Sequence, residues 1–153
     1  MRSSFRDDSS TSSFARSARK RPVLVRRLAE APTEEWHRVR NHILMDAGEL
    51  GSRNMSVTWL EVPAGIDQGL HSHEEAEQVY IVVSGRGTMT VAGDTQEVAE
   101  GDLVLVPPAT DHSIANSNAA DLCCVSVQSP PVTASEVFGR SGVGVASEYD
   151  DEE

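Results

Sequence analysis

Short apolar runs, broken at regular intervals by Gly, Pro, Asn and Asp, fill the middle of the chain. The run at 88–93 alternates and ends in Gly93-Asp94, which is typical of a β-hairpin. A short helix is expected near Thr33–Val39, where Thr33 could cap the first turn. Many short strands at this spacing predict an all-β sandwich or barrel. The predicted strands cover residues 55–62, 78–83, 88–93, 102–107, 112–116 and 122–128.

The two ends of the chain depart from this pattern. Residues 1–20 are rich in Ser and Arg without sustained periodicity, and the last six residues carry five acidic side chains. Such segments bury too little apolar surface to fold, so both are expected to be disordered. We predict a disordered basic arm at 1–22, a lead-in strand from about 23, a single barrel at 36–130 and a C-terminal extension with an acidic tail at 131–153.

Charge is distributed unevenly along the chain, whose formal net charge is −11. Residues 1–27 carry eight basic and two acidic side chains, a net charge of +6, whereas residues 28–153 carry five basic and twenty-two acidic ones, a net charge of −17. An acidic body argues against nucleic acid as a partner. The sequence has no apolar run near the roughly 18 residues that a membrane helix needs, so no membrane partner is expected. No apolar segment follows the basic N-terminal residues as it would in a secretory signal, so a cytoplasmic location is expected.

The segment HSHEEAEQ at 71–78 indicates a metal site. His71 and His73 are two residues apart, so in an extended segment their side chains project to one face. A third histidine, His112, follows Pro107-Pro108 at the start of a later predicted strand. Imidazole nitrogens bind first-row divalent metals well, and three of them with one oxygen ligand would make an open, reactive site.

These residues resemble the two sequence motifs of the cupin superfamily. The first motif, G-x5-H-x-H-x3/4-E-x6-G, is matched in order by Gly65, His71, His73, the Glu77-Gln78 pair and Gly85. The second motif, G-x5-P-x-G-x2-H-x3-N, is matched by Gly101, Pro107, His112 and Asn116. Its inner Gly is replaced by Ala109, which suggests a turn that does not need a positive φ there.

The resemblance covers about residues 36–130 and carries several expectations. It implies an all-β fold of the cupin type, a small antiparallel double-stranded β-helix or jelly-roll barrel with the metal inside. It also implies a homodimer. The metal would be one divalent transition ion, and Fe, Mn, Ni, Zn and Cu all remain open.

The fourth ligand depends on the spacing within the first motif. In the family, the ligand lies seven positions before the closing Gly, and counting back from Gly85 gives Gln78. Glu77 fits only the shorter His-to-Glu option, unless a bulge shifts the register. The resemblance therefore implies the metal ligands His71, His73, Gln78 and His112, with Glu77 as the alternative to Gln78.

A glutamine ligand has chemical consequences. Its amide oxygen is neutral and cannot act as a base. Three neutral histidines and Gln78 leave the +2 charge of the ion uncompensated, which favours an anionic ligand and Lewis-acid chemistry. A general base must then come from elsewhere, and the candidates are a metal-bound hydroxide and the two candidate catalytic residues, Glu77 and Tyr80. The residues expected to line the barrel interior are Tyr80, Val82, Ile114, Trp59 and Met89.

Two functions follow from this reading. The favoured one is a mononuclear metalloenzyme that acts on a small anionic organic molecule, either as a dioxygenase or as a Lewis-acid isomerase or lyase. The alternative is a non-catalytic cupin module that binds or senses a small molecule or a metal. A helix-turn-helix pattern beside the barrel would have favoured regulation, and the sequence contains none.

Overall fold

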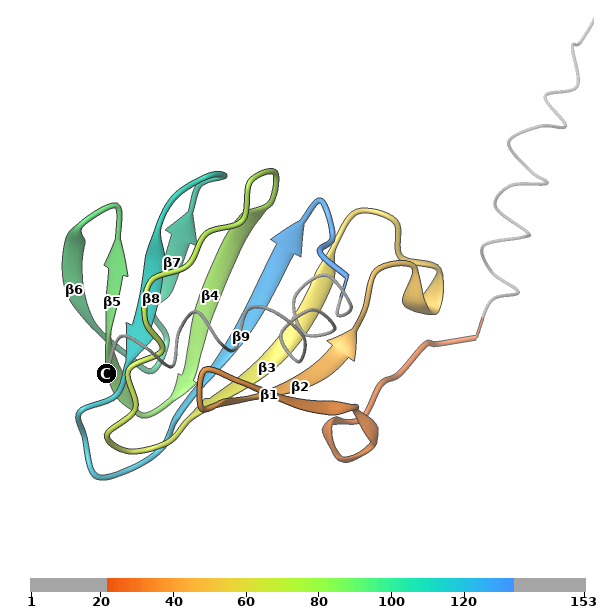
Figure 1. Ribbon diagram of the computed structural model, residues 1–153. Helices are drawn as coiled ribbons and strands as arrows, with labels where there is room; N and C mark the ends of the chain where they lie inside the picture. Colours follow the sequence, from red (N-terminus) through yellow and green to blue (C-terminus); the bar gives the residue numbers. More distant parts are fainter. Residues whose placement is uncertain (1–21, 134–153) are drawn as a thin grey trace, which may run out of the picture.

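The computed structural model describes residues 22–133, which form two antiparallel sheets that face each other (Figure 1). The elements in chain order are η1 (Leu28–Glu30), β1 (Thr33–Trp36), β2 (Val39–Met45), η2 (Glu49–Gly51), β3 (Ser56–Val62), β4 (Glu77–Ser84), β5 (Arg86–Val91), β6 (Asp94–Ala99), β7 (Leu103–Val106), β8 (His112–Ala115) and β9 (Leu122–Ser129). The all-β cupin-type barrel expected from the sequence is confirmed.

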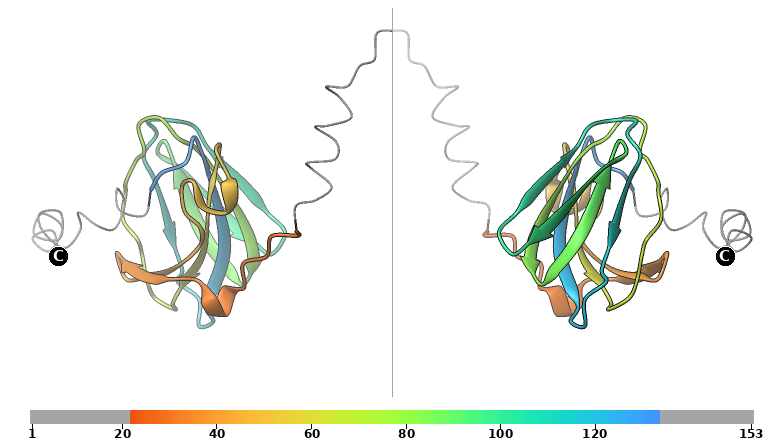
Figure 2. Two further views of the ribbon diagram at one scale, coloured as in Figure 1. Left: turned by 90° about the vertical axis from the view of Figure 1, so that its right-hand side faces the viewer. Right: turned by 90° about the vertical axis from the view of Figure 1, so that its left-hand side faces the viewer.

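The larger sheet has the strand order β1-β2-β3-β9-β4-β7, and the smaller sheet has the order β6-β5-β8. Views from either side show the two sheets facing each other across the interior (Figure 2). The segment between β3 and β4 runs beside β8, where Asp67 pairs with Ala115 and His71 pairs with His112. This segment therefore extends the smaller sheet as an irregular fourth strand.

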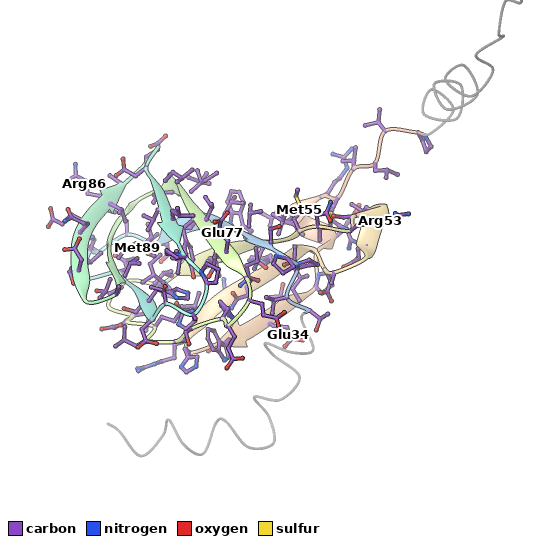
Figure 3. The ribbon with its side chains drawn as sticks, turned by 90° about the horizontal axis from the view of Figure 1, so that it is seen from above. Glu34, Arg53, Met55, Glu77, Arg86 and Met89 are labelled. Atoms are coloured by element: carbon purple, nitrogen blue, oxygen red, sulfur yellow. The ribbon has the colours of Figure 1, made fainter. Side chains whose placement is uncertain are left out.

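The interior of the barrel follows from the period-two alternation of side chains along each strand. In β4, Gln78, Tyr80 and Val82 are buried, whereas Glu77 and Ile81 are exposed and Val79 is half-buried. Met89 projects from β5 into the space between the sheets (Figure 3). The apolar core contains Val39, Leu60, Val62, Tyr80, Val82, Met89, Val98, Val106, Ile114, Leu122 and Cys124.

Six of the observed strands match the predicted ones within two residues at each end, and the other three were not predicted. The helix expected near Thr33–Val39 is wrong. Thr33–Trp36 pairs with β2 as a hairpin, and His37 and Arg38 make its turn with φ of 50° and 63°. Pairing with β2 outweighs the weak helical signal of a single capping residue.

Two further strands escaped the sequence pattern for different reasons. β6 has four exposed residues at its start, so it lacks the apolar alternation that marks a half-buried strand. β2 begins at Val39, the last residue of the expected helix, and no element was predicted for the rest of it. The lead-in strand expected from about residue 23 is also wrong, because residues 22–27 carry no regular element and the first strand begins at Thr33.

The turn around Ala109 also corrects an expectation. Ala109 has a φ of 55°, so this turn uses the left-handed conformation even without glycine. Its backbone N–H donates to the carbonyl of His73 at 2.8 Å, which holds the loop against the histidine segment. Gly85 and Gly101 also have a positive φ, 86° and 92°. Gly87 lies in β5, and a Cβ there would lie 2.4 Å from Leu122 Cδ2.

Within residues 22–133, no helix is long and apolar enough to cross a membrane. The predicted disorder of the basic arm and of the acidic tail concerns residues that lie outside the described part of the chain, except for residues 22 and 131–133. The division into arm, barrel and extension therefore stays a prediction.

Candidate metal centre

Backbone pairing brings the three motif histidines together. His71 and His73 lie in the segment between β3 and β4, and His112 is the first residue of β8. The N–H of His71 donates to the carbonyl of His112 at 3.0 Å, and the N–H of His112 donates back to His71 at 2.9 Å. These bonds hold the two histidines in register although they are far apart in sequence.

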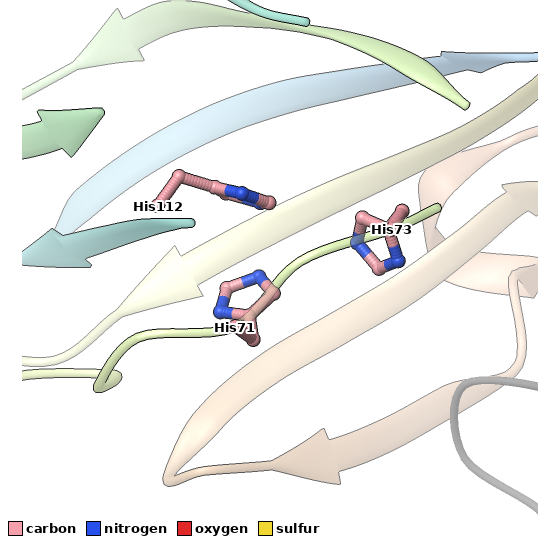
Figure 4. Close-up of side chains that lie close together, drawn as sticks. All are labelled: His71, His73 and His112. Atoms are coloured by element: carbon pink, nitrogen blue, oxygen red, sulfur yellow. The ribbon is translucent and has the colours of Figure 1, made fainter. Parts of the chain in front are cut away.

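The imidazole rings converge on one point (Figure 4). The potential ligand atoms of His71, His73 and His112 all lie within 4.8 Å of one another. Two nitrogens that each bind one ion at roughly 2.0–2.1 Å are at most about 4.2 Å apart, so movements below about 1 Å would bring all three onto a common ion. The set therefore fits a single transition metal.

The hydrogen bonds of the rings support the same conclusion. His112 Nδ1 lies 2.9 Å from the carbonyl oxygen of Thr110, and His71 Nδ1 lies 3.3 Å from that of Gly69. A carbonyl oxygen only accepts, so each Nδ1 carries the proton and each Nε2 keeps its lone pair. Metal-binding histidines commonly use this arrangement. His112 Nε2 is buried and has no hydrogen-bond partner within the described residues.

Burial keeps the imidazoles neutral. Burial, with help from the neighbouring His112, lowers the pKa of His71 to about 3 and that of His73 to about 4. Burial also lowers the pKa of His112. Neutral imidazole is the form that binds a metal, so at neutral pH no proton has to leave before binding.

Gln78 and Glu77 lie on opposite faces of β4. The side chain of Gln78 is 4% exposed and lines the same cavity as His71 and His73. Glu77 is exposed, and as the adjacent residue of the strand it projects from the other face. A bulge near Gln78 would be needed to turn Glu77 inward in its place. No bulge lies there, because Gln78 pairs regularly with Val106 and Gln128, and the register of β4 shifts only after Val82.

The amide of Gln78 is oriented by a neighbouring strand. Its Nε2 donates to Ser126 Oγ at 2.7 Å, which leaves Oε1 as the other polar end. That oxygen is buried and has no hydrogen-bond partner within residues 22–133. An amide oxygen in this position has the chemistry of a metal ligand.

The other expected interior residues divide into two groups. Tyr80 lines the cavity, and its ring centroid lies 6.0 Å from that of His112. Burial raises the pKa of the Tyr80 phenol, so it stays protonated. Val82, Met89 and Ile114 belong to the apolar core and do not line the cavity. Trp59, next to the inward Leu60, is half-buried and does not line it either.

Several cavity residues were not expected from the sequence. Trp36 lines the cavity and packs edge-on against His71, with ring centroids 4.8 Å apart. Gln68 is buried three residues before His71. The cavity has a volume of about 40 Å³. Its lining also includes Asn41, Ile43, Met45, Asp46, Ser56, Thr58, Leu60, Ser126, Gln128 and Val132.

Gln68 was missed because the local backbone breaks the strand alternation. An uninterrupted strand places residues three apart on opposite faces. Gly69, between Gln68 and His71, has a φ of 78°, and both side chains line the cavity. The signal that could have revealed this is Gly69 itself, since an isolated glycine within an extended segment often marks a bulge.

Comparison with known proteins identifies the family. The Cupin_2 family model, described as a cupin domain, matches residues 58–128. The chain is 39% identical over 82 residues to an uncharacterized protein of Streptomyces coelicolor, covering 54% of this chain and 76% of that protein. It is 30% identical over 63 residues to the oxalate-binding protein of Thermotoga maritima, covering 41% of this chain and 52% of that protein.

Solved structures share the fold. A predicted oxalate decarboxylase from Thermotoga maritima superposes with a TM-score of 0.64 at 23% identity, covering 70% of this chain and 99% of that one. A Cupin 2 conserved barrel domain protein from Salinispora arenicola superposes with a TM-score of 0.62 at 22% identity, covering 76% and 94%.

The match to some relatives is partial. An uncharacterized protein of Methanocaldococcus jannaschii is 37% identical over 70 residues, which cover 46% of this chain and 56% of that protein. The chain thus spans little more than half the length of this relative and of the oxalate-binding protein.

Proposed function

Because the chain belongs to the cupin superfamily, we propose that its barrel binds one divalent transition metal and acts on a small anionic organic molecule at that metal. The proposed metal ligands are His71, His73, Gln78 and His112. Histidine and amide donors suit Fe, Mn, Ni, Zn and Cu.

Two buried atoms without partners carry this proposal. His112 Nε2 and Gln78 Oε1 are both buried, and within residues 22–133 neither has a hydrogen-bond partner. Leaving a buried polar atom unsatisfied costs about 1–3 kcal/mol. A metal ion held between these atoms and the other two histidines would remove both costs at once.

The charge of the cavity supports an anionic ligand. All four proposed metal ligands are neutral, so the ion would keep its full positive charge. The described residues that line the cavity include no Lys or Arg, and Asp46 is the one acidic residue among them. The metal would therefore be the main attraction for a carboxylate or another anionic oxygen.

The chemistry at such a site would rely on the metal and on Tyr80. A bound divalent ion supplies Lewis acidity to an anionic oxygen. Tyr80 remains protonated, so we assign it the role of a hydrogen-bond donor to negative charge that develops on the bound molecule. Glu77 has no supporting observation as a base, since it is exposed on the opposite face of β4. Because the neutral ligand set leaves the ion its full Lewis acidity, we favour Lewis-acid isomerisation or elimination over dioxygenation. Oxygen consumption by the Fe(II)-loaded protein would contradict this preference.

A second candidate is ligand binding without turnover. The cavity lining offers Asp46 as its one carboxylate, and the relative from Thermotoga maritima is named for binding oxalate. Saturable binding of a small carboxylate, with the ligand recovered unchanged after long incubation, would favour this alternative.

The fourth ligand provides the sharpest test of the metal proposal. We expect Gln78→Ala to weaken Mn²⁺ or Zn²⁺ binding at least tenfold, which corresponds to about 1.4 kcal/mol. The matched neighbour Glu77→Ala should bind the metal as the wild type does. Titration calorimetry on the metal-free proteins measures both. Equal losses in the two variants, or a loss only in Glu77→Ala, would defeat the assignment.

We further propose that the barrel forms a homodimer through the outer face of the larger sheet. Leu103 and Leu105 of β7 are 61% and 50% exposed, and they pair with Ile81 and Val79 of β4. This row of four apolar side chains carries no charge on an otherwise acidic chain, which suits a second copy. Light scattering should give a dimeric mass for the wild type and a monomeric mass for a Leu103→Asp, Leu105→Asp variant. The cytoplasmic location stays a prediction from the sequence.

A further inference from the structure

Gln68 presents a buried acceptor that the proposed metal site does not use. Its backbone N–H donates to the carbonyl of Ile114 at 3.0 Å, which fixes this residue beside β8. Its side chain is 4% exposed and lines the cavity together with His71 and His73. Gln68 Oε1 is buried and has no hydrogen-bond partner within the described residues.

Three other polar side chains of the cavity wall make hydrogen bonds within the protein. Asn41 Nδ2 donates to the carbonyl of Val39 at 3.0 Å. Ser56 Oγ accepts from the N–H of Val132 at 3.3 Å, and Ser126 Oγ accepts from Gln78 Nε2 at 2.7 Å. Two amide oxygens of the wall are buried without a hydrogen-bond partner within the described residues, Gln78 Oε1 and Gln68 Oε1. The proposed metal uses Gln78 Oε1, so Gln68 Oε1 is left for a molecule inside the cavity.

The type of group that Gln68 can accept follows from its chemistry. A carbonyl oxygen pairs only with a donor, such as a hydroxyl. A buried acceptor without such a donor destabilises the folded protein. The cavity of about 40 Å³ exceeds the roughly 10–15 Å³ that one water molecule needs, so it has room for a small polar group next to Gln68.

We propose that the cavity selects a hydroxy acid, whose carboxylate is held at the metal and whose hydroxyl donates to Gln68 Oε1. This inference rests on the proposed metal-dependent binding of a small anion. A simple dicarboxylate would not satisfy Gln68, because fully ionised oxalate has only hydrogen-bond acceptors and offers no proton to Gln68 Oε1. Gln68 would thus determine specificity without binding the metal.

The test uses two acids that differ by one hydroxyl. Glycolate and acetate are titrated into the Zn²⁺-loaded full-length protein by calorimetry. A hydroxyl can favour glycolate through the metal alone, so the decisive quantity is the ratio of the two affinities in the wild type compared with that in Gln68→Leu. We expect the variant to lower this ratio about tenfold while acetate binds as before. Gln68→Met, with an unbranched apolar side chain, should give the same result if Gln68→Leu packs poorly.

The controls separate this inference from the metal proposal. Zn²⁺ affinity should be the same in the wild type and in both Gln68 variants, and Gln96→Met, at an exposed glutamine of β6, should leave the glycolate-to-acetate ratio unchanged. A wild-type protein that binds no metal would refute the proposed function itself. A metal-loaded wild type that does not prefer glycolate, or an equal loss for both acids in Gln68→Leu, would overturn the role of Gln68 alone. Reduced Zn²⁺ affinity in the Gln68 variants would also overturn it, because Gln68 would then support the metal.

Discussion

The two ends of the barrel interior are built by the same strands but from different residues. At one end, the inward positions of β3, β4 and β9 are Ser56, Gln78 and Ser126. At the other end, the inward positions of these strands are Val62, Val82 and Leu122. We call them the polar end and the apolar end. Tyr80, which belongs to the apolar core and also lines the cavity, lies between them.

Within each of these strands, the residues at the apolar end stabilise the fold, whereas the residues at the polar end line the candidate site. Burying an apolar side chain such as Val82 or Leu122 contributes about 1.5–3 kcal/mol, so the apolar end holds the sheets together. The polar end leaves His112 Nε2, Gln78 Oε1 and Gln68 Oε1 without partners, which costs stability. A fold can carry such a cost when the other end supplies the stability and when a bound group satisfies the atoms.

The largest effect on stability is expected at the apolar end. Leu122 is buried within the core, and Leu122→Ala should lower the free energy of unfolding by about 2–5 kcal/mol through lost burial and the cavity left behind. Urea unfolding of the metal-free protein measures this loss. The variant should still bind the metal when folded. A loss below about 1 kcal/mol would show that the apolar end does not carry the stability of the fold.

At the polar end, the largest expected effect is on metal binding. His112→Ala should weaken Zn²⁺ binding by at least a hundredfold, about 2.7 kcal/mol, because it removes a ligand whose backbone is fixed to His71. His42→Ala is the matched control, since His42 contacts Thr33 and Glu61 and does not line the cavity. Calorimetric titration of both variants compares them. Equal Zn²⁺ affinity in the two variants would show that His112 is not a metal ligand.

A smaller effect is expected at Ser126, which orients the amide of Gln78. Ser126→Ala should lower Zn²⁺ affinity about tenfold, a typical cost of losing a residue that positions a metal ligand. Ser126→Thr, which keeps the hydroxyl, should restore most of the affinity. If Ser126→Ala binds the metal as tightly as the wild type, or if Thr gives no rescue, the hydrogen bond to Gln78 does not position the ligand.

A change of pH tests the burial of the histidine rings without any substitution. Burial lowers the pKa of His71 to about 3 and of His73 to about 4, below the usual 6.5. Between these values and 6.5 the unfolded chain binds more protons than the folded one, so the metal-free protein should lose stability as pH falls below about 6.5. The loss should continue until the folded-state pKa values are reached. Thermal unfolding across this window measures it, and a His71→Phe, His73→Phe variant should show a weaker dependence. A melting temperature that is flat over this range would contradict burial of the neutral rings.

The sequence predicted the parts of the molecule that depend on local spacing. The strands around 78–83 and 122–128 follow from apolar runs that tertiary pairing then confirms. The three histidines were identified because two of them are two residues apart and the third follows a Pro-Pro turn. The structure brings these three side chains together.

Other parts depend on contacts that spacing does not encode. Gln68 reaches the cavity because Gly69 interrupts the alternation, and Ala109 takes a positive φ in a turn tied to the carbonyl of His73. β6 is mostly exposed, so its residues carry no apolar pattern. Trp36 joins the site through a hairpin that the sequence suggested was helical. Whether Gln78 binds the metal, and whether Tyr80 and Glu77 take part in chemistry, stay predictions.

Metal content tests the central claim most directly. The full-length protein, purified without a metal-binding tag, and its His112→Ala variant would be analysed by elemental mass spectrometry before and after reconstitution with Fe²⁺, Mn²⁺, Ni²⁺, Zn²⁺ or Cu²⁺. We predict about one transition metal ion per wild-type chain and almost none in the variant. A wild type that stays metal-free after reconstitution, or equal metal content in the two proteins, would contradict the account.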